Sequence, residues 1–115
     1  MAIDSLPSLG VKFEHAQNMG PGVILELAAM SSVDDGFAPF ETSRFSIAPG
    51  CRTGEDKHAA REMWIVGSGS GILTYDNVDT GVRTGDFLFF RTQARHSIRN
   101  NGYEELQIYS IWWSR

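Results

Sequence analysis

The chain contains very little cysteine and no concentration of basic residues. Cys51 is the only cysteine among its 115 residues, which excludes an internal disulfide framework and a zinc site built from clustered cysteines. Ten lysines and arginines face 14 aspartates and glutamates, so the formal net charge is −4. An acidic chain without a basic patch binds nucleic acids and anionic membranes poorly. We therefore expect neither kind of partner.

Long apolar runs are also missing. No uninterrupted apolar stretch of the chain is long enough to span a bilayer. The first ten residues, MAIDSLPSLG, lack the basic end and the apolar core of a secretory signal peptide. A single thiol is also typical of proteins from a reducing compartment. These features together predict a cytoplasmic protein.

What the chain does contain is a series of short apolar stretches separated by glycines and other turn-forming residues. Its length suits one domain with a buried core, and we expect an N-terminal arm over residues 1–12 and one domain over residues 13–115. The predicted strands cover residues 23–30, 42–47, 63–66, 72–75, 80–83, 87–90, 96–100 and 105–113. Short strands at regular spacing, without a convincing helix, indicate an all-β sandwich or barrel.

Two dipeptides mark predicted turns in the second half of the chain. Asp76-Asn77 separates two of the predicted strands. Asn101-Gly102 is the strongest hairpin signal, because both residues readily adopt the left-handed backbone of a tight turn. We therefore expect a hairpin between the last two predicted strands.

The residues able to carry chemistry gather around two histidines, His58 and His96. If Asp56 and His58 lie on one extended segment, both side chains share a face with their Cα atoms about 7 Å apart. An oxygen and an imidazole nitrogen can then reach one ion, each at about 2 Å. Glu62 joins them only if the chain turns over residues 59–61, and His96 must come from a distant strand. Two imidazoles with one or two carboxylates suit iron, manganese, nickel, cobalt or zinc.

This part of the sequence resembles the two motifs of the cupin family. The first motif is matched by Gly50, His58, Glu62 and Gly69, with Asp56 at the position of the motif's first histidine. The second motif is matched by Gly85, Asp86, the apolar residues 87–90, His96 and Asn100. The resemblance implies a cupin-type double-stranded β-helix, a jelly-roll barrel, with one mononuclear metal ion inside. It also implies that His58, Glu62 and His96 are three of the family's four usual ligands.

The chain departs from the family pattern at two places. Asp56 stands where the family has a histidine, so Asp56 is either the fourth ligand or a nearby group that orients a ligand or acts as a general base. The turn over residues 91–95 lacks the family's proline and glycine. Its two arginines, Arg91 and Arg95, could contact an anionic substrate near the mouth of the barrel.

Each candidate also has an ordinary structural interpretation. The two histidines could be structural or surface residues, Glu62 could pair with a neighbouring cation on the surface, and Asp56 could be a solvated loop residue. Glu55 is a rival carboxylate, but strand alternation places it on the face opposite His58. The registration of these residues with both motifs favours the metal site.

The resemblance leaves two functions open. The first is a metal-dependent enzyme that acts on a small molecule by oxygenase, isomerase, lyase or cyclase chemistry, with one divalent ion per chain and with Asp56 and Glu62 able to move protons. The second is a non-catalytic cupin that binds or senses a small ligand, which the missing family histidine supports. A purely structural barrel that binds a protein partner has only Trp112-Trp113 in its favour.

The aromatic residues suggest a substrate pocket and a subunit interface. Trp64 follows Glu62 by two residues and shares its face of a strand, so we expect both inside the barrel. Phe89 and Tyr109 are further candidates for the substrate pocket. One ring of Trp112-Trp113 must face outward, where an exposed indole is unfavourable unless a partner covers it. Single-domain cupins often pair, and we expect a homodimer.

Overall fold

The computed structural model describes residues 11–14, 16–29, 39–56 and 58–114 of the chain. These residues form nine strands and no helix. The strands are β1 (Gln17–Asn18), β2 (Val23–Leu27), β3 (Glu41–Ile47), β4 (Arg61–Ser68), β5 (Ser70–Tyr75), β6 (Val78–Arg83), β7 (Phe87–Phe90), β8 (His96–Arg99) and β9 (Leu106–Trp113). The all-β class is confirmed, and β1 is the one strand that the sequence did not predict.

Most of the expected N-terminal arm, residues 1–10, lies outside the described part of the chain. The same is true of residue 30, the predicted end of the strand that the structure shows as β2. No helix of the described residues has the length and apolarity needed to cross a membrane.

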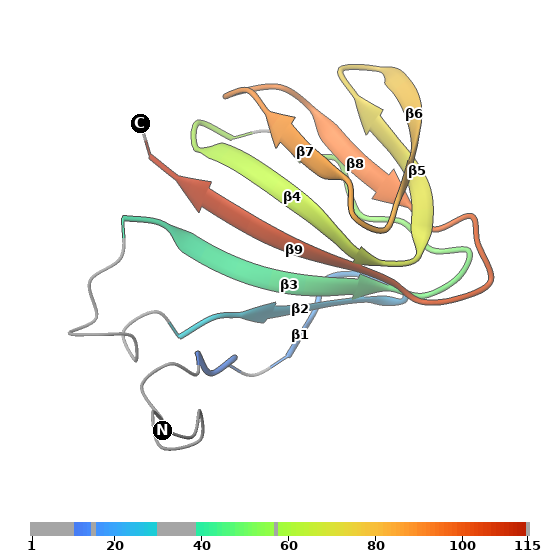
Figure 1. Ribbon diagram of the computed structural model, residues 1–115, viewed down its shortest axis with the longest axis horizontal. Helices are drawn as coiled ribbons and strands as arrows, with labels where there is room; N and C mark the ends of the chain where they lie inside the picture. Colours follow the sequence, from blue (N-terminus) through green and yellow to red (C-terminus); the bar gives the residue numbers. More distant parts are fainter. Residues whose placement is uncertain (1–10, 15, 30–38, 57, 115) are drawn as a thin grey trace.

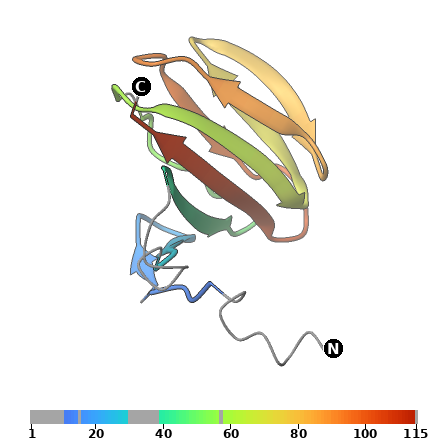
Figure 2. The same cartoon turned by 60° about the vertical axis from the view of Figure 1, so that its left-hand side comes forward.

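The strands form two antiparallel sheets that make up the walls of a jelly-roll barrel. The larger sheet has the order β1-β2-β3-β9-β4-β7, and the smaller has the order β6-β5-β8. Figures 1 and 2 show the smaller sheet lying across from β4 and β7. The chain passes from one sheet to the other after β4, β6, β7 and β8, so the consecutive strands β7, β8 and β9 alternate between the sheets.

Alternation along the strands determines which side chains enter the barrel. On β4, Glu62, Trp64 and Val66 are buried while the residues between them are not. Trp64 lies opposite Leu88 of β7 and Ser110 of β9. Because directly opposed residues point to the same face of a sheet, this register brings Ser110 into the interior beside Glu62.

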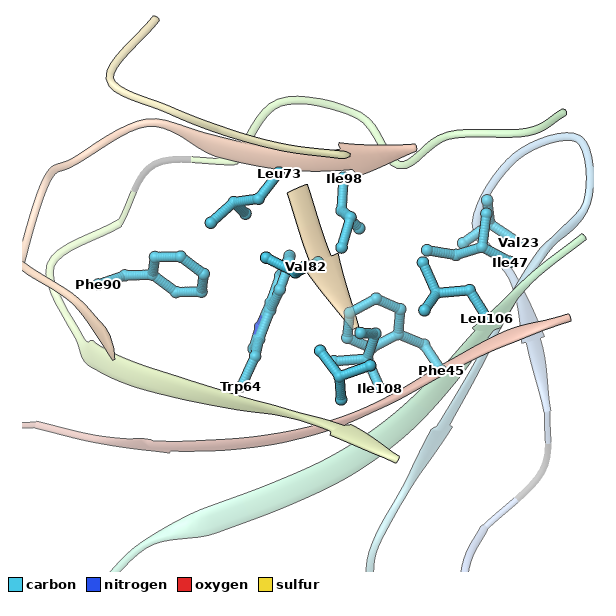
Figure 3. Packing of buried hydrophobic residues seen from close by; sticks show 11 residues of the cluster. Val23, Phe45, Ile47, Trp64, Leu73, Val82, Phe90, Ile98, Leu106 and Ile108 are labelled. Atoms are coloured by element: carbon cyan, nitrogen blue, oxygen red, sulfur yellow. The ribbon is translucent and has the colours of Figure 1, made fainter. Parts of the chain in front are cut away.

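The hydrophobic core lies between the sheets (Figure 3), and the ring of Trp64 in this core lies 5.3 Å from that of His96, centroid to centroid. Trp64 is the central ring of the core, with edge-to-face contacts to Phe45 and Phe90 at centroid distances of 5.1 and 4.8 Å. In Figure 3, Leu73 and Ile98 of the smaller sheet point toward these rings. Burying each such side chain stabilises the folded state by roughly 1.5–3 kcal/mol. These buried side chains form the wall behind the site.

The two predicted turns have different outcomes. Asp76 and Asn77 join β5 to β6, and their φ angles of 48° and 69° confirm a tight left-handed turn. The predicted hairpin at Asn101-Gly102 is wrong, because β8 and β9 belong to different sheets. Neither residue is among those with positive φ, so the dipeptide lies in a crossover between the sheets.

A buried side chain, Asn100, organises that crossover. Its Nδ2 group donates hydrogen bonds to the carbonyl oxygens of Ile47 and Glu104, at 2.8 and 2.7 Å. Its Oδ1 atom accepts a hydrogen bond from the backbone N–H of Gly102 at 2.9 Å. Asn100 is 1% exposed, so these three bonds replace water for every polar atom of its amide.

Candidate metal centre

The segment before β4 is attached to β8 through the backbone. The N–H group of Asp56 donates to the carbonyl of His96 at 2.9 Å, and the N–H group of His96 donates to the carbonyl of Asp56 at 3.0 Å. Nearby, the N–H group of Gln93 donates to the carbonyl of His58 at 2.8 Å. The two motifs, far apart in the sequence, are therefore held side by side by main-chain bonds.

Glu62 reaches the same place because the chain bends just before it. Residues 59–60 form a bend, and β4 begins at Arg61. Glu62 is thus the second residue of its strand, and its side chain points inward with 8% exposure. This is the turn that the sequence required for Glu62 to approach Asp56 and His58.

Four candidate donor atoms converge at this point. One donor atom each from Asp56, His58, Glu62 and His96 lies within 4.8 Å of all the others. Glu62 Oε1 is 2.9 Å from His58 Nε2 and 3.1 Å from His96 Nε2. Asp56 Oδ2 is 3.6 and 4.0 Å from the same two nitrogens. Donors that each lie about 2.0–2.2 Å from a shared ion are separated by about 3–4 Å, so this set fits one metal ion.

The backbone orients both imidazole rings. His58 Nδ1 lies 3.0 Å from the carbonyl oxygen of Ala60, and His96 Nδ1 lies 3.1 Å from that of Ala94. A carbonyl can only accept, so each Nδ1 donates a proton to its carbonyl, and each ring turns its Nε2 atom toward the cluster. Ligating histidines are held in the same manner in known metal sites.

Glu62 is held through one carboxylate oxygen and presents the other. Oε2 accepts a hydrogen bond from Trp64 Nε1–H at 2.8 Å and another from the hydroxyl of Ser110. Oε1 faces the two rings. Sequence reasoning missed Ser110, although a serine between the inward apolar residues Ile108 and Trp112 was the available signal.

The same contacts determine the protonation of the cluster. Burial alone would raise the pKa of Glu62, but hydrogen bonds from His96, Ser110, Trp64 and His58 lower it from 4.5 to about 2. Burial would lower the pKa of His96, but its bond to Glu62, the Ala94 carbonyl and the nearby carboxylates raise it. Glu62 is therefore a carboxylate at neutral pH, the form that binds a cation.

The cluster lies in the wall of a cavity of about 640 Å³. Trp64 also lines this cavity, as the sequence suggested. Glu55 contributes to the lining too, although it is not part of the donor cluster. A cavity of this size lies within the range of about 300–1,000 Å³ that is usual for small-molecule sites.

Two residues proposed from the sequence for the substrate pocket lie elsewhere. Phe89 and Tyr109 do not line the cavity, and they are 54% and 37% exposed. They lie opposite Met63 and Ile65 of β4, whose side chains point away from the interior. The prediction that these two rings line the pocket is therefore corrected, because the strand register turns both of them away from the interior. The sequence alone did not reveal this register.

The arginines of the turn after β7 are also outside the cavity lining. The backbone N–H and Nε–H groups of Arg91 donate to the hydroxyl of Tyr75 at 3.2 and 3.4 Å. Arg95 is exposed, and its backbone N–H donates to Asp76. The expectation that these two side chains meet a substrate at the barrel mouth has no support in their positions.

Comparison with known proteins agrees with this geometry. A family model described as the cupin domain matches residues 43–112, more than half of the chain and the whole donor cluster. The chain belongs to the cupin family. Its cupin fold is therefore established, and both the motif match and the jelly-roll prediction are confirmed.

Solved structures similar to this cupin come from several bacteria. A Cupin 2 conserved barrel domain protein from Salinispora arenicola is 35% identical with a TM-score of 0.64; the alignment covers 67% of this chain and 65% of that one. A protein from Photorhabdus luminescens is 22% identical with a TM-score of 0.73, covering 85% and 80%. A Thermotoga maritima protein, named as a predicted oxalate decarboxylase, is 21% identical with a TM-score of 0.72, covering 94% and 96%.

Proposed function

We propose that this cupin is a metal-dependent enzyme that acts on a small molecule bound in the cavity. The supporting observation is that four donor atoms converge on the wall of a cavity of about 640 Å³. One divalent ion of iron, manganese, nickel, cobalt or zinc suits these donors. When bound, such an ion supplies a Lewis acid for a substrate oxygen, which is common to oxygenase, isomerase, lyase and cyclase chemistry.

The residues of the cluster have two different roles, metal binding and proton transfer. His58, His96 and Glu62 hold the ion, since both rings present Nε2 and Glu62 is anchored by Trp64. A pKa of about 2 makes Glu62 a poor proton carrier near neutral pH. Proton transfer is better assigned to Asp56, whose side chain is 61% exposed at the cavity and lies 3.6 Å from His58 Nε2.

The metal content of the purified protein tests the first part of this proposal. The protein is prepared without a chelating tag, and its metals are quantified by inductively coupled plasma mass spectrometry. We expect close to one ion per chain, with a large loss in His58→Ala and in His96→Ala. His15→Ala is the control, because His15 belongs to neither motif. Equal metal content in all four proteins would contradict the proposed site.

Turnover tests the second part. The metal-loaded protein is incubated with a small-molecule extract, and consumption of compounds is followed by mass spectrometry. We expect Asp56→Asn to retain the metal but to consume the substrate far more slowly, whereas Glu105→Gln, at an exposed carboxylate outside the cavity lining, turns over like the parent. A loaded protein that retains a compound without changing it would instead identify a non-catalytic binding cupin.

A further inference from the structure

Apolar side chains make up a large part of the cavity lining beside the donor cluster. Strand alternation on β2 and the rings of the larger sheet supply this part of the lining. The residues concerned are Met19, Val23, Leu25, Leu27, Phe45 and Trp112. Met19 is 55% exposed, and Leu25 and Leu27 are only half-buried. Apolar side chains left partly open inside a concave site favour a ligand that covers them with apolar surface.

The charged lining residues of the cavity are all acidic. Glu55, Asp56 and Glu62 line it, and none of the lysines and arginines in the described part of the chain does so. Arg44, the arginine of β3, is instead bound to Glu26 at 2.8 Å, and neither residue lines the cavity. Among the described residues, every aspartate, glutamate, lysine or arginine that lines the cavity is therefore acidic.

These charges also cancel that of the expected ion. A divalent cation bound by Glu62 has no net charge when it is counted together with the carboxylates of Glu62 and the nearby Asp56, and Glu55 adds a negative charge to the lining. An anionic substrate entering the cavity would lose its hydration without meeting a lysine or arginine among the described lining residues, and it would be repelled by Glu55. An uncharged substrate suffers neither effect.

We infer that the substrate of this cupin is an uncharged, largely apolar molecule that reaches the metal cluster through one or two oxygen atoms and lays its apolar body against β2. This inference rests on the proposed function, because the cluster supplies the polar end of the site. It assigns the selection of substrate to two sets of residues: the acidic lining beside the ion, and the apolar side chains Met19, Leu25 and Leu27.

A matched pair of probes tests the inference. 4-tert-Butylcatechol and 3,4-dihydroxybenzoate carry the same two adjacent hydroxyl groups, but one bears an apolar group where the other bears a carboxylate. Binding of each to the zinc-loaded full-length protein is measured by titration calorimetry at pH 7, since zinc does not oxidise the catechol. We expect the uncharged probe to bind at least about tenfold more tightly, the ratio that corresponds to 1.4 kcal/mol.

Three variants identify the origin of that preference. Met19→Arg places a cation at the cavity, at an exposed position that tolerates a polar side chain, and should lower the preference about tenfold. Leu27→Ala should weaken 4-tert-butylcatechol by about three- to tenfold through lost apolar contact and leave 3,4-dihydroxybenzoate unchanged. Ile24→Arg is the control: Ile24 lies on the same strand, is 38% exposed and does not line the cavity. It should leave the preference as in the parent.

The zinc content of each calorimetry sample distinguishes a failure of the substrate preference from a failure of the metal site. If zinc is bound and 3,4-dihydroxybenzoate binds as tightly as 4-tert-butylcatechol or more tightly, the inference is overturned while the metal site of the proposed function stands. An equal effect of Met19→Arg and Ile24→Arg would also overturn it, because the charge of the cavity would then have no special influence. A protein that binds no zinc or other divalent ion overturns the proposed function, and the inference with it.

Discussion

Replacing Trp64 by phenylalanine removes one hydrogen bond from the candidate metal centre while keeping an aromatic ring at the position. The indole Nε1–H donates to Glu62 Oε2 at 2.8 Å, and a phenyl ring has no such donor. A phenyl ring at this position keeps much of the contact with Phe45 and Phe90, whose rings meet Trp64 edge to face. The substitution therefore tests whether the anchoring of Oε2 positions Oε1 for the ion.

The size of the effect follows from the kind of bond that is lost. A hydrogen bond to a charged group contributes about 1.5–3 kcal/mol, and loss of a partner that orients a metal ligand weakens metal affinity about 10- to 100-fold. Ser110 still donates to Oε2 in the Trp64→Phe protein, so we expect the lower end, about tenfold. Ser110→Ala should act similarly, and the double variant should not be additive because both donors serve one oxygen.

The assay is competition for zinc with a chromophoric chelator at pH 7.5. Trp112→Phe is the matched control, since Trp112 lines the same cavity and Glu62 Oε2 receives its indole hydrogen bond from Trp64. We expect the control to bind zinc like the parent. Parental affinity in both Trp64→Phe and Ser110→Ala would refute the reasoning, because the position of the carboxylate would then depend on neither donor.

Three further outcomes are expected. The pKa of Glu62 is lowered from 4.5 to about 2 in the folded protein. The ionised carboxylate therefore stabilises the folded state fully at pH values above the pKa of the unfolded chain, and this stabilisation is lost as the pH falls toward the folded-state pKa. The stability advantage of the metal-free parent over Glu62→Gln, measured by urea unfolding, should shrink by about 2 kcal/mol between about pH 5 and pH 3. Asn100→Ala should lower the free energy of unfolding by about 2–4 kcal/mol through stranded buried partners, whereas exposed Asn101→Ala should change it by less than about 0.5 kcal/mol. If the chain forms the expected homodimer through the outward ring of the Trp112-Trp113 pair, Phe89→Ser, whose ring lies 6.5 Å from that of Trp113, should shift its sedimentation toward the monomer, and Val78→Ser, on β6 of the other sheet, should not.

Local patterns were sufficient to predict most of the fold. Apolar–polar alternation and turn-forming dipeptides are patterns of neighbouring residues. The strands and the Asp76-Asn77 turn could therefore be recognised in the sequence. The spacing of Asp56, His58 and Glu62 was also informative, because only one bend was needed to bring them together. His96 required the family resemblance, since nothing local shows that β8 passes beside Asp56.

What the sequence did not reveal depends on pairing between distant strands. Ser110 reaches Glu62 because β9 lies beside β4 in one particular register. The same register turns Tyr109 and its neighbours outward. The hairpin expected at Asn101-Gly102 failed for a related reason: a turn-forming dipeptide shows that the chain changes direction, but not to which sheet the next strand belongs.

The paired backbone bonds between Asp56 and His96 have a consequence for how this coordination sphere can change. The main chain, not the carboxylate, fixes position 56 opposite the second motif. A substitution at position 56 therefore exchanges one metal-binding side chain for another on an unchanged backbone. Histidine in place of aspartate would leave one more positive charge on a loaded centre. The oxidation state and the redox potential that the metal centre favours can thus change through the residue at position 56, without any rearrangement of the strands.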